Sequence, residues 1–213
     1  MVNLWTGALT TLETAKLFIG IPEDDADRDR DKIVTLMINS VSAWFERQTG
    51  RKLGLAAYDE KYAGTDAQEL CLRQYPIVKV ESIFDTENGG EISPDAYGFV
   101  DTGDIGVLFK DDGWAMPSYR VGLAFDPKFP KRYLRVKYKA GYVLPKDATR
   151  RQPSTLPPDI EGMILEMLQQ QYNLMKDGAQ NLSSFSISDV SWSFDKTTKQ
   201  SWLETLAAHK RWW

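Results

Sequence analysis

Histidine and cysteine, two side chains often used for nucleophilic or metal chemistry, each occur once in this chain. His209 stands near the end of the sequence, so a Ser-His-Asp or Cys-His arrangement would have to be built on a terminal helix. Cys71 lies between Leu70 and Leu72 in an apolar run, which is typical of packing and leaves no disulfide framework or multi-cysteine metal site. These residues do not predict an enzyme, a metal or a cofactor.

Acidic residues gather at two places where they could hold a cation. The run of residues 23–31 lacks the glycine and the terminal glutamate of a calcium-binding loop. Its carboxylates instead suit the position just before or within the first turn of a helix. Asp111 and Asp112 precede Gly113, and adjacent acids before a glycine are typical of a turn. Neither place predicts a metal site, and no glycine-rich phosphate-binding motif occurs.

Positive charge is concentrated in one segment, although the chain as a whole is acidic. The net charge is -4, yet residues 126–151 hold nine lysines or arginines and two aspartates. That segment is therefore +7, and the remainder of the chain is -11. Arg135, Lys137 and Lys139 alternate with apolar residues, so a strand here would place the cations on one face. Such a face is either solvated or in contact with a partner.

The basic segment is also compatible with a nucleic-acid-binding module over residues 128–151. Tyr133, Tyr138 and Tyr142 are interleaved with cations, and such a pattern can contact phosphates while the rings stack on bases. The pI of about 5.2 for the whole chain counts against this alternative.

The N-terminal part of the chain predicts two helices. Thr10 and Glu13 form a capping-box pattern before an apolar run that Gly20 and Pro22 end. A second helix follows the acidic run and ends at Gly50, a natural C-terminal cap. Its stripe recurs at steps of three and four and comprises Ile33, Leu36, Met37, Val41, Trp44, Phe45 and Gln48.

The C-terminal part predicts two more helices and an arm between them. Pro157 and Pro158 open a helix that ends near Asp177, and Ser183–Phe194 alternates as a strand or an ordered arm would. The final helix begins near Thr198. The two tryptophans at the end of the chain are costly to expose, so they either anchor an interface or pack back on the monomer.

Between residues 56 and 142 the pattern changes to that of antiparallel strands. Short apolar or alternating runs are separated by clusters of Gly, Pro, Asp or Asn, and Asn88-Gly89-Gly90 marks a turn. The runs are Tyr58, Lys61–Tyr62, Glu69–Leu72, Ile77–Phe84, Gly106–Phe109 and Tyr133–Lys139.

We therefore expect an α+β fold, with a mainly α-helical bundle body, an inserted antiparallel β-rich lobe and a C-terminal arm and helix. The chain is predicted to be a single domain over 1–213. Its parts are N-terminal helices at 1–55, a β-rich region at 56–142 with a lobe at about 86–130, a core helix at 153–178, and the arm and helix at 183–213. No stretch approaches the ~20 apolar residues of a membrane span, and no signal peptide is evident, so we expect synthesis in the cytoplasm.

The succession of these segments resembles the head-to-tail connector proteins of tailed bacteriophages, also called adaptor or head-completion proteins. The matching segments cover most of the chain: Leu9–Lys16, Glu46–Arg51, Leu70–Leu72 with Tyr75–Val80, Tyr138–Tyr142 and Leu156–Ile160. The long region 86–130 departs from the compact members of that family.

The resemblance implies a structural virion protein at the head-to-tail interface rather than an enzyme. It implies a dodecameric ring that binds the portal protein on one side and a stopper or tail-completion protein on the other. Double-stranded DNA would pass through the lumen without specific binding, and no membrane partner is implied.

The resemblance also suggests which residues make contacts. Similar proteins use their C-terminal segment against the portal, which makes Trp202, Leu203, Leu206, Lys210, Arg211, Trp212 and Trp213 docking candidates. A virion subunit needs surfaces of opposite charge, and the candidates for a subunit or partner contact are Arg135, Lys137, Lys139, Asp24, Asp25 and Asp27.

Overall fold

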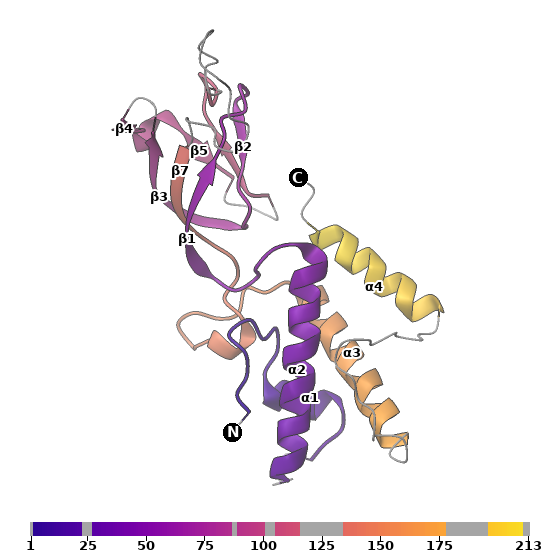
Figure 1. Cartoon of the computed structure of the whole chain (residues 1–213). Helices are drawn as coiled ribbons and strands as arrows, with labels where there is room; N and C mark the ends of the chain where they lie inside the picture. The colour runs from indigo at the N-terminus through magenta and orange to yellow at the C-terminus, as the bar shows by residue number, and fades with distance from the viewer. Residues whose placement is uncertain are drawn as a thin grey trace, which may run out of the picture. The chain divides into compact units, whose positions relative to one another are not determined.

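The computed structural model describes residues 2–22, 27–86, 89–100, 105–115, 134–177 and 196–210. The chain forms two compact units, each with its own interior (Figure 1). The helical unit lies within residues 1–52 and 143–212, and the sheet unit lies within residues 53–142. The chain therefore leaves the helical unit once, builds the sheet unit, and returns.

The helix α2 (Arg28–Thr49) is the longest element of the helical unit and contacts its other three helices. These are α1 (Leu12–Phe18), α3 (Pro158–Asp177) and α4 (Lys196–His209), all visible in Figure 1. A 3-10 turn at Pro145–Asp147 precedes α3. The packing around α2 fixes the helical unit.

Both ends of α2 are capped by residues of a suitable type. The Asp27 carboxylate accepts hydrogen bonds from the backbone N–H groups of Asp29 and Arg30, at 3.0 and 3.2 Å. Gly50 ends the helix in the left-handed conformation with φ 69°, and its N–H donates to the carbonyl of Glu46 at 3.0 Å. The predicted cap at Gly50 is confirmed.

The cap of α1 differs from the one that the sequence pattern indicates. The side chain of Thr11, rather than that of Thr10, accepts the hydrogen bond from the Thr14 N–H at 3.0 Å. Thr10 is fully buried, and its hydroxyl donates to Oε1 of Glu161 in α3 at 2.9 Å. The predicted cap at Thr10 was wrong because this hydroxyl serves a contact between helices.

One face of α2 is buried in the core of the helical unit. Its buried apolar residues follow one another at steps of four and three, namely Val34, Ile38, Val41 and Phe45. The predicted stripe was partly wrong, because Ile33 and Leu36 are 37% and 53% exposed. Two apolar stripes lie on different sides of this helix, and the sequence pattern merges them.

The described part of the sheet unit contains two antiparallel sheets. The larger has the strand order β1-β7-β3-β4 and the smaller has the order β2-β6-β5. The strands are β1 (Ala56–Tyr62), β2 (Glu69–Cys71), β3 (Ile77–Asp85), β4 (Gly90–Glu91), β5 (Gly98–Phe99), β6 (Val107–Phe109) and β7 (Leu134–Ala140), with a 3-10 turn at Pro94–Ala96. The first and last strands, β1 and β7, pair directly along their full length (Figure 1).

The central strand β7 shows the predicted alternation of buried and exposed residues. Leu134, Val136, Tyr138 and Ala140 point into the core, and the cations between them are exposed. Leu70, Leu108 and Trp114 join the same core from the smaller sheet and the segment after β6. The alternation predicted for this strand is confirmed.

Directly after β7 the backbone makes a turn that requires glycine. Gly141 has φ 108°, and an added Cβ would lie 2.6 Å from the carbonyl oxygen of Gly54. The close approach lets the Tyr142 N–H donate to the Leu53 carbonyl at 2.7 Å, and the Leu55 N–H donate to the Tyr142 carbonyl at 2.8 Å.

The fold is α+β with substantial β structure, and the prediction of a helical bundle body was wrong. One of the described helices, α1, has only seven residues. The described helices do not form a bundle that serves as the body of the protein. The strands bury large side chains such as Trp114 and Tyr138 in a core of their own. The predicted C-terminal helix is present as α4, while the predicted arm at 183–194 lies outside the described residues.

Candidate functional site

The outer face of the four-stranded sheet gathers cations from three strands. Arg135, Lys137 and Lys139 of β7 are exposed on this face. The register places Lys61 of β1 opposite Arg135 and Lys79 of β3 opposite Lys139. We call these five residues the cationic sheet face.

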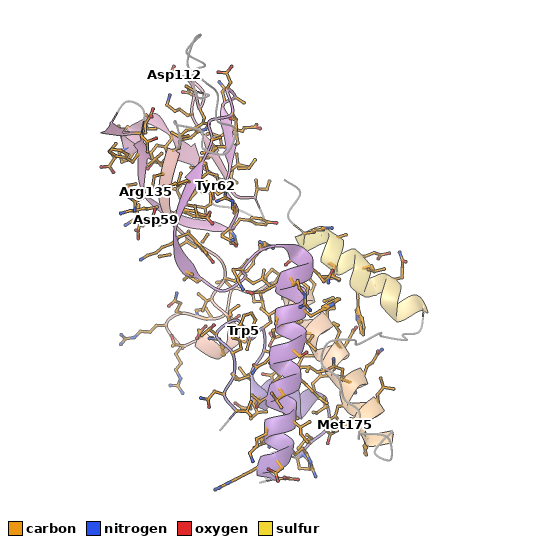
Figure 2. The ribbon with its side chains drawn as sticks, in the orientation of Figure 1. Trp5, Asp59, Tyr62, Asp112, Arg135 and Met175 are labelled. Carbon is orange, nitrogen blue, oxygen red and sulfur yellow. The ribbon has the colours of Figure 1, made fainter. Side chains whose placement is uncertain are left out.

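One cation of this face is neutralised by a two-point ion pair. Arg135 donates from Nε to Oδ1 of Asp59 at 2.7 Å and from its terminal nitrogen to Oδ2 at 2.6 Å. Figure 2 shows the two labelled side chains close together on the sheet unit. The hydrogen bonds from Arg135 hold the pKa of Asp59 below its usual range. The carboxylate therefore stays charged at neutral pH.

Lys79, Lys137 and Lys139 are less fully neutralised than Arg135. Lys139 forms only a loose pair with Glu81, with 3.6 Å between Nζ and Oε1. No described residue forms an ion pair with Lys79 or Lys137. Lys79 and Lys139 face each other across the two strands, which is unfavourable for like charges, and Phe84 is 40% exposed on the same face. The isolated fold gains little from this arrangement, so the face is a candidate contact surface.

A polar cluster lies on the inner side of the same sheet. The hydroxyls of Tyr62 and Tyr138 both donate to Oε2 of Glu60, the second at 2.7 Å. They accept in turn from the backbone N–H groups of Arg73 and Gln74, at 2.9 and 3.3 Å. Burial, together with the hydrogen bonds donated to Glu60, raises the pKa of both phenols. The cluster fastens the loop between β2 and β3 to the sheet, and we assign it a structural role.

The helix α4 is attached to the helical unit along one narrow stripe. Its buried residues are Trp202, Leu206 and His209. Nε1 of Trp202 donates to Oε2 of Glu166 at 2.9 Å, and Nε2 of His209 lies 2.7 Å from Oδ2 of Asp159. Both acids belong to α3, so polar contacts hold α4 at each end of the stripe.

This attachment divides the predicted docking residues into two groups. Trp202 and Leu206 lie in the interior of the helical unit, whereas Leu203 is 50% exposed and Lys210 is exposed. Residues 211–213 lie outside the described residues. The docking role of this segment stays a prediction.

The acidic candidates belong to the helical unit. Asp27 caps α2, and the backbone hydrogen bonds that it accepts from Arg30 and Asp29 lower its pKa. Asp24 and Asp25 lie outside the described residues. Asp27 therefore has a defined structural role, and its predicted role in a charge contact stays a prediction.

A second exposed surface lies on the side of α2 that is turned away from the helical core. Its members recur at alternating steps of four and three and form what we call the outer row: Asp29, Ile33, Leu36, Ser40, Ala43 and Arg47. All six residues are exposed. Met37 and Trp44, which flank the row, are half-buried.

Sequence reasoning missed Lys61, Lys79 and Asp59 as members of the charged face. Lys61 and Asp59 could have been found from the alternation along β1. Lys79 could not, because register shifts after Ile77 and Val80 interrupt the alternation of β3.

Two kinds of site have no candidate among the described residues. No group of three His, Cys, Asp or Glu side chains within these ranges could hold a metal ion. None of the described helices is long and apolar enough to cross a membrane.

Comparison with known proteins adds a likeness at the level of fold. No family model and no curated protein matches the sequence. A chain from the neck of an empty gene transfer agent particle, with C6 symmetry, matches with a TM-score of 0.58 and 14% identity, over 97% of this chain and 94% of that chain. A chain from the virion of a native gene transfer agent particle gives 0.57 and 12%, over 96% and 92%.

A third match is a chain from the neck of the native particle with C12 symmetry, with a TM-score of 0.52 and 14% identity. It covers 97% of this chain and 94% of the matched chain. At these identities the comparison establishes the fold alone. This chain shares its fold, over almost its whole length, with chains of the neck and virion of gene transfer agent particles.

Proposed function

We propose that this protein is a structural subunit of the neck of a tailed, phage-like particle. In this proposal a ring of copies joins the portal of the DNA-filled head to the stopper or tail component. The observation that carries it is the likeness to neck chains over 97% of this chain and 94% of the matched chain. A location in the virion and a mechanical rather than catalytic role follow from the proposal.

The proposed assembly is a homo-oligomeric ring. The matched necks have C6 and C12 symmetry, which favours a ring of twelve copies for this chain as well. A closed ring requires unlike faces to meet between neighbours. The cationic sheet face is one such face, and Asp24, Asp25 and Asp27 are the proposed acidic counterpart.

The alternative of a nucleic-acid-binding module has less support. Tyr138 is fully buried and Tyr142 is 6% exposed, so neither ring is available to stack on bases. Tyr133 lies outside the described residues, so within the described part of this segment the remaining contacts are those of cations such as Lys137 with phosphates. Affinity for double-stranded DNA that falls steeply with salt would favour this alternative, and absence of binding at low salt would remove it.

The central experiment is disruption of the gene in the phage or particle that encodes this chain, followed by electron microscopy. We expect DNA-filled heads beside unattached tails, because the joining ring is missing. A plasmid copy of the intact gene is the control and should restore complete particles. Complete, normal particles without the protein would contradict the proposed function.

Docking to the portal is proposed to use the C-terminal segment beyond α4. A truncation after Lys210 is the appropriate variant, because it retains His209, whose carbonyl accepts a hydrogen bond from Nε of Arg51 at 3.2 Å. The truncated chain should keep the circular dichroism of the intact protein and lose capture by the purified portal. Loss of the fold instead would indicate that residues 211–213 pack on the monomer.

A further inference from the structure

The outer row of α2 has the spacing of a helix-packing seam. Steps of four and three place Asp29, Ile33, Leu36, Ser40, Ala43 and Arg47 along one line of the helix surface. The row runs over 19 residues, 29–47, or about 27 Å of helix. It is therefore a continuous strip rather than a scatter of exposed side chains.

The composition of the row changes from its ends to its centre. Charged residues stand only at the two ends, Asp29 at the amino end and Arg47 at the carboxyl end. Between them Leu36 is 53% exposed, Ile33 is 37% exposed, and the other two positions are small. An uncharged centre with a charged rim is the usual arrangement of a protein interface.

The monomer does not need apolar residues in this row. The opposite side of α2 already supplies the helical core through residues such as Ile38 and Phe45, both fully buried. Exposed positions of a helix are normally occupied by polar residues. Charged and amide side chains have helix propensities comparable to that of leucine, so helix formation does not require apolar residues in this row. Ile33 and Leu36 are exposed one turn apart in a single uncharged strip, and this contiguity, rather than the exposure of either residue alone, points to a contact outside the single chain.

We infer that the outer row of α2 packs against a second copy of this chain in the ring, an inference that rests on the proposed function. Each subunit of a closed ring is contacted by a copy on both sides, so an extended lateral face is required on every copy. The opposite charges of Asp29 and Arg47 allow each end of the row to pair with a complementary charge of the neighbour. Nucleic acid does not fit, because the row offers phosphates a single cation over its length.

The first test substitutes one residue at the centre of the row. Leu36→Glu should leave the circular dichroism and thermal midpoint nearly unchanged, because the side chain is half exposed and glutamate is a good helix former. Incorporation into particles should fall at least tenfold. Leu174→Glu, at a position of α3 that is 66% exposed, is the matched control and should assemble normally. Normal incorporation of Leu36→Glu, or equal loss in both variants, would overturn the inference.

The second test does not depend on the folding of a charged variant. A photo-crosslinking benzoylphenylalanine is placed at position 36, and purified particles are irradiated and analysed by mass spectrometry. Crosslinks between two copies of this chain support the inference. Crosslinks only to another virion protein, or none in particles that contain the chain, overturn it and leave the proposed function standing. Absence of the unmodified chain from particles overturns both.

Discussion

The two units of this protein expose surfaces of opposite character. The sheet unit presents five cations on one face, only one of them in a two-point ion pair, while the helical unit presents the outer row of α2 with its uncharged centre. A charged contact weakens with salt, whereas burial of apolar surface does not. A subunit built this way separates a salt-sensitive contact from a salt-insensitive one.

The interiors of the two units differ in how their buried polar groups are arranged. In the helical unit the buried polar contacts join separate helices and segments, as in the hydrogen bonds of Thr10 to Glu161 and Trp202 to Glu166. In the sheet unit the phenols of Tyr62 and Tyr138 bring polar groups inside the core. The polar interior of the sheet unit can be tested at Tyr138, and its crowded backbone at Gly141.

The largest expected difference between the units comes from Gly141→Ala. The new Cβ would lie 2.6 Å from the Gly54 carbonyl oxygen at a backbone φ of 108°, so we expect a loss of about 3 kcal/mol or more in the free energy of unfolding. Urea denaturation should report this loss, and hydrogen exchange should show reduced protection in β7 while α2 keeps its protection.

Gly50→Ala in the helical unit is the matched control. Its φ of 69° is also left-handed, but no atom lies within 4 Å of the added Cβ. Only the backbone strain remains, which costs about 1 kcal/mol. Equal losses in the two variants would show that the close approach at Gly141 contributes nothing.

A second difference should appear at high pH. The unfolded phenols lose their protons near pH 10, while burial and the hydrogen bonds to Glu60 raise the pKa of Tyr62 and Tyr138 in the folded state. The unfolded state thus releases protons first, so stability is unchanged below pH 10 and falls as the pH rises further. Urea midpoints measured across this range should decline for the intact chain.

Tyr138→Phe separates the titration from general alkaline damage. The variant should lose about 1–3 kcal/mol at neutral pH, because the hydrogen bonds of the Tyr138 hydroxyl to Glu60 and from the N–H of Gln74 are removed. Its stability should then decline less steeply above pH 10 than that of the intact chain. A decline of the same slope would mean that other groups control the alkaline transition.

The positions of the helices and strands were largely predictable from the sequence. The division of the fold into two cores was not. The spacing of apolar residues located α2, and the alternation of β7 followed from the local sequence. The division into two cores did not follow, because it depends on which strands share Trp114 and Tyr138 as a common interior. The local spacing of apolar residues does not indicate which distant segments contact each other.

The candidate contact residues show the same limit. The cations of β7 were found because a strand of period two must place them together. Trp202 was predicted as a docking residue because similar proteins use their C-terminal segment, and no pattern in the sequence indicates that its indole N–H donates to Glu166 inside the helical unit. Leu36 was placed on the same stripe as the buried Val41 and Phe45 because both apolar stripes of α2 satisfy a helical period.

A smaller effect should separate the two exposed surfaces by their response to salt. Lys137→Gln removes a cation that lies opposite Asp59 without adding a like charge there, so the fold should lose little stability. Ring assembly, followed by sedimentation velocity, should weaken a few-fold at low salt and approach that of the intact chain at high salt. Leu36→Glu should impair assembly at both salt concentrations, and identical salt responses of the two variants would contradict the separation.

Asp59→Asn should have the smallest effect on stability, because its pair with Arg135 lies on an exposed face. The lowered pKa of Asp59 means that the pair contributes above the unfolded value of 3.8 and is lost as the pH falls through the folded pKa. The small difference between the urea midpoints of the two chains should therefore disappear on acidification. The same variant releases Arg135, so the cationic sheet face gains charge and salt-dependent assembly should change more than stability does. A larger change in stability than in assembly would indicate that the cationic sheet face stabilises the monomer and does not contact a partner.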